Sequence, residues 1–174
     1  MRNWFREQMA MYTAYHRDLR NCATHFIGVP LIVFALLVAM SLVQIGLFGG
    51  IPITLAALFL SLLLLLYCLA VPAMGIVSVV VYLPLLWYAQ AMSLGSTTFV
   101  WVVIGACFVG GWILQLIGHV FEGRKPALTG NLLQVFMAPG FLVAEALFAC
   151  GVLGELRADL EARSRKYAQT EATD

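Results

Sequence analysis

The chain has 174 residues, of which 62% are hydrophobic and 11% charged, and its formal net charge is +1. So small a charge gives no electrostatic field strong enough to hold a nucleic acid, whose binding requires clustered Lys and Arg to neutralise phosphates. The stretch Asn21–Phe121 contains no Asp, Glu, Lys or Arg, whereas a soluble domain distributes charge along its whole length. The composition therefore indicates a membrane protein with a single domain.

Residues 1–25 are expected to form an amphipathic helix that lies at the membrane interface. Within Trp4–Thr24, aromatic and apolar side chains stand beside arginines, a pattern typical of interfacial helices. The segment lacks a compact apolar core followed by a small-residue cleavage site, so we expect it to be retained rather than removed as a signal peptide.

Four segments within residues 26–121 are long and apolar enough to cross a hydrocarbon layer of about 30 Å, which takes about 20 helical residues. They are Phe26–Ile45, Ile53–Val71, Met74–Leu94 and Thr98–Phe121. The short turns between them contain Gly and Pro, which favour antiparallel neighbours. Because the apolar runs are continuous rather than alternating, they exclude the strands of a β-barrel. The predicted fold is all-α, a polytopic transmembrane helical bundle.

The basic residues predict the orientation of this bundle. They precede the first span and follow the fourth, and four crossings return the chain to the side on which it started. Basic residues mark the cytoplasmic side, so both termini are expected there, together with the charged tail of residues 155–174. The residues are Arg2, Arg6, Arg17 and Arg20 before the first span, and Arg124 and Lys125 after the fourth.

The segment 131–154 does not fit this topology as a simple span. Leu132–Gly154 is long enough for one crossing and too short for two, yet it must begin and end on the cytoplasmic side. We therefore expect a re-entrant or interfacial pair of helices, broken at Pro139 and Gly140, with Glu145 in the second arm. A true fifth span is the alternative.

The three histidines of the chain all lie near the edges of the charge-free stretch. His16 and His25 precede the first span, and His119 ends the fourth. Four crossings place them at similar depth on one face, where three imidazoles can hold a metal and leave coordination positions open. The alternative is that each is an ordinary interfacial histidine, hydrogen-bonded or reaching toward water.

The spacing around His119 supports a shared site. Gln115, His119 and Glu122 occur at i, i+4 and i+7, which places them on one stripe of a helix, and a His-x-x-Glu pair is a metal-ligand spacing of helical bundles. Beyond this stripe, Arg124 and Lys125 can either attract the carboxylate of a lipid or fatty acid or serve only as topology markers.

The spacing of the first two histidines adds a condition. Tyr12 and His16 share a helical face, as do Asn21 and His25, but His16 and His25 are nine residues apart and would point in opposite directions on a straight helix. They can share a metal only if the helix ends or bends between them. Asn21 and Thr24 are plausible places, because their side chains compete for backbone hydrogen bonds.

Two sequence motifs resemble the Mpo1-like family. The stretch from Tyr15 to Pro30 contains the pattern H-x4-N-x3-H, and the stretch from Gly111 to Ala127 contains G-H-x2-E-G-x2-P-A. The resemblance covers residues 12 to about 150 and leaves the last twenty or so residues outside.

This resemblance implies an iron(II)-dependent dioxygenase that removes one carbon from a 2-hydroxy fatty acid. On that view His16, His25 and His119 hold Fe(2+), and Glu122 is a further ligand or a partner that orients a histidine. The substrate and O2 would meet at the cytoplasmic face, with the acyl chain among the helices and membrane lipid around them. No nucleotide-binding glycine motif is present.

The alternative function is a small membrane transporter or lipid-binding scaffold, whose histidines bind protons or lipid head groups. The charge-free spans argue against ion transport, which usually requires ionisable groups deep in the membrane. Short loops and compact size favour a bacterial inner membrane over the endoplasmic reticulum of a eukaryote. The sequence assigns no oligomeric state.

Overall fold

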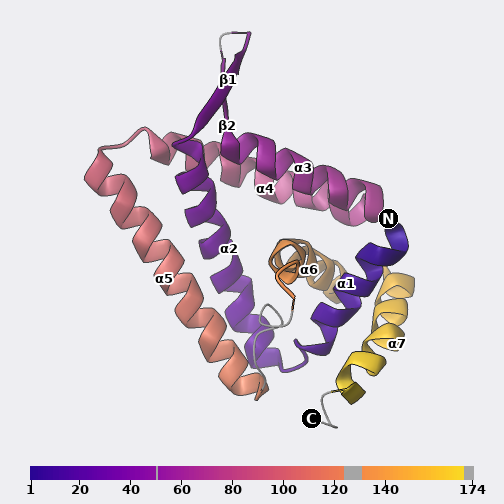
Figure 1. Cartoon of the computed structure of the whole chain (residues 1–174). Coiled ribbons are helices and arrows are strands. Elements are labelled where there is room, and N and C mark those ends of the chain that lie inside the picture. Colours follow the sequence, from indigo (N-terminus) through magenta and orange to yellow (C-terminus); the bar gives the residue numbers. More distant parts are fainter. Residues whose placement is uncertain (50, 124–130, 171–174) are drawn as a thin grey trace. The chain divides into compact units, whose positions relative to one another are not determined.

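The computed structural model describes residues 1–49, 51–123 and 131–170 and confirms the helical class of the fold (Figure 1). It divides into two compact units, Ile27–Ile113 on the one hand and Met1–Phe26 with Leu114–Asp174 on the other. The elements in chain order are α1 (Arg2–Ala14), α2 (Leu19–Ser41), β1 (Gln44–Phe48), β2 (Ile51–Thr54), α3 (Leu55–Ala70), α4 (Pro72–Ser93), α5 (Thr97–Glu122), α6 (Gln134–Ala149) and α7 (Gly154–Thr170).

Three of the described helices, rather than the expected four, are long and apolar enough to cross a membrane. They are α2, α4 and α5, with 23, 22 and 26 residues. Helix α3 occupies most of the expected span Ile53–Val71 but has only 16 residues, or about 24 Å at 1.5 Å per residue. The protein is thus a membrane protein by the length and composition of its helices, and the number of crossings stays a prediction.

A β-hairpin accounts for the shorter α3, because it takes up residues that were expected to be helix or turn. Strands β1 and β2 pair antiparallel, with Phe48 opposite Ile51 across a turn in which Gly49 has a φ of 57°. Helix α2 consequently ends at Ser41 instead of Ile45. Helix α3 begins only after Thr54, whose hydroxyl caps it by accepting a hydrogen bond from the Ala57 N–H at 3.2 Å.

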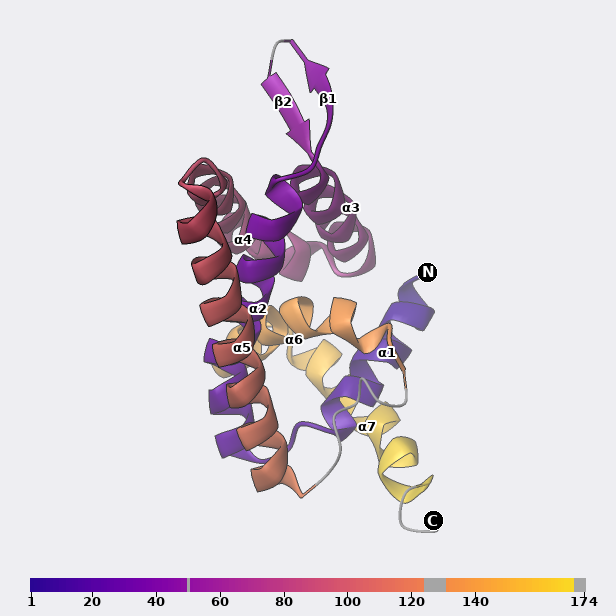
Figure 2. The same ribbon diagram turned by 60° about the vertical axis from the view of Figure 1, so that its left-hand side comes forward.

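Within the unit Ile27–Ile113, α3 and α4 lie side by side (Figures 1 and 2). They are joined at Val71, and Pro72 occupies the first turn of α4, where a proline has no hydrogen bond to lose. Their backbones approach closely at Gly75, since a Cβ there would collide with the backbone of Cys68. The glycine is therefore required by packing.

In the other unit, the N-terminal segment is two helices rather than the single one expected over Trp4–Thr24. Helix α1 ends at Ala14, and α2 starts at Leu19. The apolar face of α1 packs against α6 and α7, with Phe5 and Met9 buried. This packing gives α1 a protein partner for the side chains that were expected to face the membrane interface.

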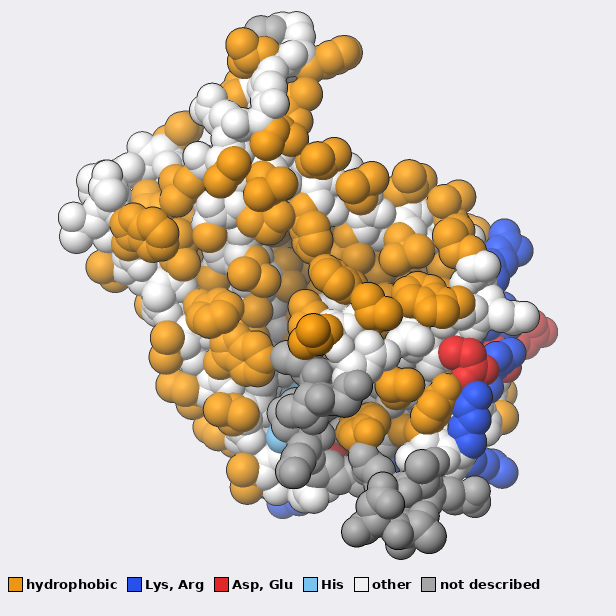
Figure 3. All heavy atoms as spheres, viewed as in Figure 1, with side chains coloured by type: hydrophobic (Ala, Val, Ile, Leu, Met, Phe, Trp, Pro, Cys, Tyr) orange, Lys and Arg blue, Asp and Glu red, His pale blue; other side chains and the backbone are white. Residues whose placement is uncertain are grey.

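Helix α7 is fastened to α1 by charged side chains, which gather over these two helices in Figure 3. The Glu7 carboxylate accepts hydrogen bonds from Arg163 at 2.7 Å, Lys166 at 2.6 Å and Tyr167 at 2.8 Å. Hydrogen bonds from Lys166, Tyr167 and Arg163 lower the pKa of Glu7 to about 2. We call this group the α1–α7 ion cluster.

The break expected at Pro139 and Gly140 is absent, because α6 runs through both residues from Gln134 to Ala149. A proline inside a helix removes one backbone hydrogen bond and normally kinks or ends it. Here Pro139 and Gly140 are buried, so the packing of the helix outweighs the loss. Helix α6 has 16 residues and falls short of the length of a span.

Candidate metal centre

The first histidine lies in a four-residue loop, Tyr15–Asp18, between α1 and α2. The Asp18 carboxylate accepts a hydrogen bond from the Arg20 N–H at 2.8 Å and so begins α2. The Glu122 carboxylate, at the end of α5, accepts hydrogen bonds from the backbone N–H groups of Arg17 at 3.0 Å and Asp18 at 2.8 Å. The helix therefore ends before Asn21 and Thr24, not at them as expected, and the loop frees His16 to turn toward His25.

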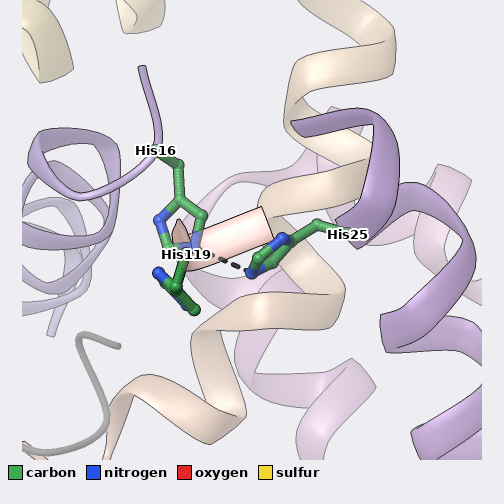
Figure 4. A group of neighbouring side chains, drawn as sticks. All are labelled: His16, His25 and His119. Carbon is green, nitrogen blue, oxygen red and sulfur yellow. Dashed lines mark hydrogen bonds between the residues drawn. The ribbon is translucent and has the colours of Figure 1, made fainter. Parts of the chain in front are cut away.

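The three histidines converge as predicted, each from a different element (Figure 4). His16 comes from the loop, His25 from α2 and His119 from α5. One nitrogen of each lies within 4.8 Å of the others. All three side chains are buried, with exposed fractions of 6%, 2% and 8%. The cluster is thus a compact set of three nitrogen donors shielded from water.

Backbone carbonyls determine which nitrogen of His16 and His25 carries the proton. His16 Nδ1 lies 2.8 Å from the Tyr12 carbonyl oxygen, and His25 Nδ1 lies 2.9 Å from that of Asn21. A carbonyl oxygen can only accept, so each Nδ1 is the donor and each neutral ring presents an Nε2 lone pair. These two Nε2 atoms are 3.1 Å apart, an arrangement that needs a proton or a cation between them.

His119 supplies the third donor. Its Nδ1 is buried and has no hydrogen-bond partner among the residues described, and leaving such a group unpaired destabilises a fold.

The His16 ring is in the protonation state that metals require. Burial and the neighbouring His25 lower the pKa of His16 to about 3, so that ring is neutral at physiological pH, the form that binds metals. The donors therefore fit a metal ion that accepts imidazole, iron included.

Glu122 holds the loop and the start of α2. Besides the two backbone N–H groups of the loop, its carboxylate accepts a hydrogen bond from Asn21 Nδ2 at 3.0 Å. The Asn21 carbonyl is in turn the acceptor for His25, so Glu122 connects to that imidazole through one residue. Among the described residues, the His, Cys, Asp and Glu side chains whose ligand atoms lie within 4.8 Å of one another are the three histidines, without Glu122. Both predicted roles of Glu122, further ligand or orienting partner, stay predictions, and this geometry favours the second.

Aromatic rings cover one side of the cluster. The Tyr12 ring stacks on His16, with centroids 3.9 Å apart and planes within 2°. Phe141 of α6 lies against both, at 4.6 Å from Tyr12 and 5.8 Å from His16. Tyr12 was predicted from the sequence but Phe141 was not, because no local spacing connects residues so far apart in the chain.

The other predicted site residues have different fates. Gln115 is buried, and its Nε2 lacks a hydrogen-bond partner in the described part of the chain. Glu145 is half-buried on α6 and is not a member of the histidine cluster. Arg124 and Lys125 lie outside the described residues, so their role as carboxylate-binding or topology-marking residues stays a prediction.

Comparison with known proteins agrees with the motifs. Residues 2–149 match the family described as 2-hydroxy-palmitic acid dioxygenase Mpo1-like. The chain is 36% identical over 158 residues to the 2-hydroxy-palmitic acid dioxygenase MPO1 of Saccharomyces cerevisiae, covering 90% of this chain and 87% of the yeast protein. No solved structure matches. With a family match over most of its length and a relative this similar, the chain belongs to the Mpo1-like family.

Proposed function

We propose that this protein is a membrane-embedded, iron(II)-dependent dioxygenase that shortens 2-hydroxy fatty acids by one carbon. The observation that carries the proposal is the pair of Nε2 lone pairs facing each other at 3.1 Å. His119, whose buried Nδ1 has no hydrogen-bond partner among the residues that the structure describes, completes the set of candidate metal ligands. The name of the yeast relative supports a fatty-acid dioxygenase role, and iron and the loss of one carbon are our additions.

The proposed reaction balances without a further reductant. A 2-hydroxy acid R–CH(OH)–COOH and O2 give the shortened acid R–COOH, CO2 and H2O. The bond between C1 and C2 breaks, and the two carbons together lose four electrons, which reduce O2. Bound iron(II) would supply the redox chemistry that lets O2 react with such an acid. This balance removes the need for oxoglutarate, flavin or a reductase.

The chain's own residues would bind, orient and shield. Tyr12 and Asn21 hold His16 and His25 by their carbonyls, which fixes the ring nitrogen that each presents. Burial of the three rings excludes water. Helices α2 and α5, which carry His25 and His119, have no charged residue between Asn21 and Ser41 or between Thr97 and Phe121, and such apolar surfaces suit an acyl chain.

We further propose that the site faces the cytoplasm, together with both termini. The arginines near the N-terminus and the basic residues of α7 belong to the same unit as the histidines, and basic residues favour the cytoplasmic side. In a bacterium this is the inner face of the inner membrane, and in a eukaryote the corresponding membrane is the endoplasmic reticulum. Labelling of cysteines introduced near either terminus, with a reagent that does not cross membranes, tests this orientation.

The test of the function is metal analysis and oxygen consumption by the purified protein in detergent with 2-hydroxypalmitate. We expect the protein to retain iron and to release pentadecanoate and CO2. His16→Ala, His25→Ala and His119→Ala should each lose iron and activity while the helices remain folded. Gln90→Leu is the control, since Gln90 lies on α4 and donates to Thr54 at 3.1 Å.

A protein with all its histidines that neither keeps iron nor consumes O2 would end the proposal. A transporter or scaffold makes the opposite prediction for the variants. Substituting its histidines would change proton or lipid binding without any accompanying loss of iron.

A further inference from the structure

Gln115 is a buried carboxamide for which the fold provides no evident use. It is 7% exposed, and its Nε2 atom has no hydrogen-bond partner within residues 1–49, 51–123 and 131–170. It is the one carboxamide in α5. A buried NH2 group without an acceptor destabilises a protein, whereas a leucine would fill similar space without that penalty. The orphaned amide therefore points to an acceptor that belongs to a ligand.

Helix geometry places Gln115 on the side of α5 that faces the histidine cluster. At about 100° per residue, its direction lies between those of Gly118 and His119, about 60° from the first and 40° from the second. Gly118 abuts the first turns of α2, because a Cβ there would meet Thr24 and Asn21. His119 belongs to the cluster. Gln115 thus lies on the site's side of the helix.

Gln115 also lies deeper along the helix than the cluster. It is four residues before His119, or about 6 Å nearer the apolar middle of α5 at 1.5 Å per residue. Long helical side chains lean toward the N-terminus, so the side chains of Gln115 and His119 extend in the same direction and keep this offset of about 6 Å. A fatty acid with its carboxylate at the cluster and its chain toward the middle of the helix would pass this amide with the atoms that follow C1.

We propose that Gln115 determines specificity for 2-hydroxy acids, by donating a hydrogen bond from Nε2 to the 2-hydroxyl oxygen of the substrate. This inference rests on the proposed function. The hydroxyl is the polar atom on the chain side of the head group, where the amide lies, whereas an acid without it would leave the amide unpaired. A site built to hydrogen-bond a hydroxyl discriminates strongly against the analogue that lacks it.

A structural pair is the competing assignment. Asn21 Oδ1 is a buried acceptor that likewise has no partner among the residues with described positions. If Gln115 served only to pair with Asn21, replacing it would weaken the fold and leave the choice of ligand unchanged. The two assignments therefore predict different thermal stability and different ligand selectivity for a protein in which Gln115 is replaced.

The experiment measures binding of 2-hydroxypalmitate and palmitate to the iron-loaded protein without oxygen, so that no turnover occurs. Gln115→Leu should weaken binding of 2-hydroxypalmitate about tenfold, the loss expected for one hydrogen bond to a ligand. Palmitate affinity should change less than about twofold, and the melting temperature of the ligand-free protein should not fall. Gln90→Leu, the same substitution at an amide that is already paired, should lower the melting temperature and leave both affinities unchanged.

The other outcomes overturn the inference in distinguishable ways. Equal weakening of both acids would place the hydrogen bond on the carboxylate. Unchanged affinities with a lower melting temperature would make Gln115 structural. If the unaltered protein itself bound both acids equally, Gln115 would not determine specificity; a failure of the proposed function would instead appear as a protein that keeps no iron and consumes no O2 with 2-hydroxypalmitate.

Discussion

A methyl group added at Gly118 tests whether the close approach of α5 to the first turns of α2 holds the histidines together. In Gly118→Ala, the new Cβ would overlap the Thr24 hydroxyl and the Asn21 carboxamide, and it would lie 3.1 Å from His25 Nδ1. Neither side chain can move aside freely. The Thr24 hydroxyl donates to the Asn21 carbonyl at 2.8 Å, and Asn21 Nδ2 donates to Glu122 at 3.0 Å.

The expected change in the free energy of unfolding follows from two destabilising contributions and one stabilising contribution. Overpacking a tight contact costs about 1 to 3 kcal/mol, and each hydrogen bond that yields costs about 1 kcal/mol more. Replacing glycine by alanine within a helix returns about 1 kcal/mol. The net expectation is a loss of about 1 to 3 kcal/mol in the free energy of unfolding. To relieve the overlap α5 must shift away from α2, which would move His119 away from His25 and so disrupt the histidine cluster.

The assay is the iron content and melting temperature of Gly118→Ala beside Gly110→Ala. Gly110 is on the same helix, and a Cβ there meets nothing within 4 Å among the described residues. The control should therefore melt at the same or a higher temperature and keep its iron, whereas Gly118→Ala should melt lower and lose iron. Equal behaviour of the two variants would refute the reasoning.

Three other side chains allow separate tests. Glu122→Gln keeps the shape of the side chain but removes its charge, which weakens the hydrogen bonds from the loop N–H groups; we expect iron affinity to fall about tenfold in a chelator competition, and an unchanged affinity would contradict the orienting role. Tyr12→Leu removes the ring stacked on His16 and should lower the free energy of unfolding by about 1 kcal/mol. Tyr12→Phe keeps the ring and should retain more iron than Tyr12→Leu. Equal iron losses in the two variants would argue against a role for the stacked ring. Glu7 has a folded-state pKa of about 2 against an ordinary value of 4.5, so its stabilising effect is fully present above pH 4.5 and is lost as the pH falls toward 2. As the pH falls through this range, the melting temperature should therefore drop less steeply for Glu7→Gln than for the unaltered protein. Parallel plots of melting temperature against pH for the two proteins would argue against the α1–α7 ion cluster.

The apolar helices were predictable because their composition allows few alternatives. A long apolar run without charge has no side that favours water, and a helix is the structure that satisfies all backbone hydrogen bonds within a single segment in lipid. Helices α2, α4 and α5 confirm this expectation. The hairpin was missed because Gly46 and Pro52 favour a turn locally, while the pairing of β1 with β2 depends on contacts between two segments.

The expected break in α6 was wrong because local preferences were given too much weight there. Pro139 and Gly140 disfavour a helix by their local properties, so a break was expected there. Both residues are buried in the structure, and α6 continues through them. Local propensity is worth a few kcal/mol at most, so the burial of several neighbouring side chains can outweigh it.

For the candidate metal centre, the sequence by itself identified the candidate ligands, because the chain has only three histidines and all of them lie near the edges of the charge-free stretch. Tertiary structure decided how they meet. The helix break at Tyr15–Asp18 depends on Glu122, which lies more than 100 residues away in the chain. Nearby backbone carbonyls determine which ring nitrogen His16 and His25 present, and the helix break determines where those carbonyls lie. Such hydrogen bonds form only after the chain has folded, and no pattern of neighbouring residues records them.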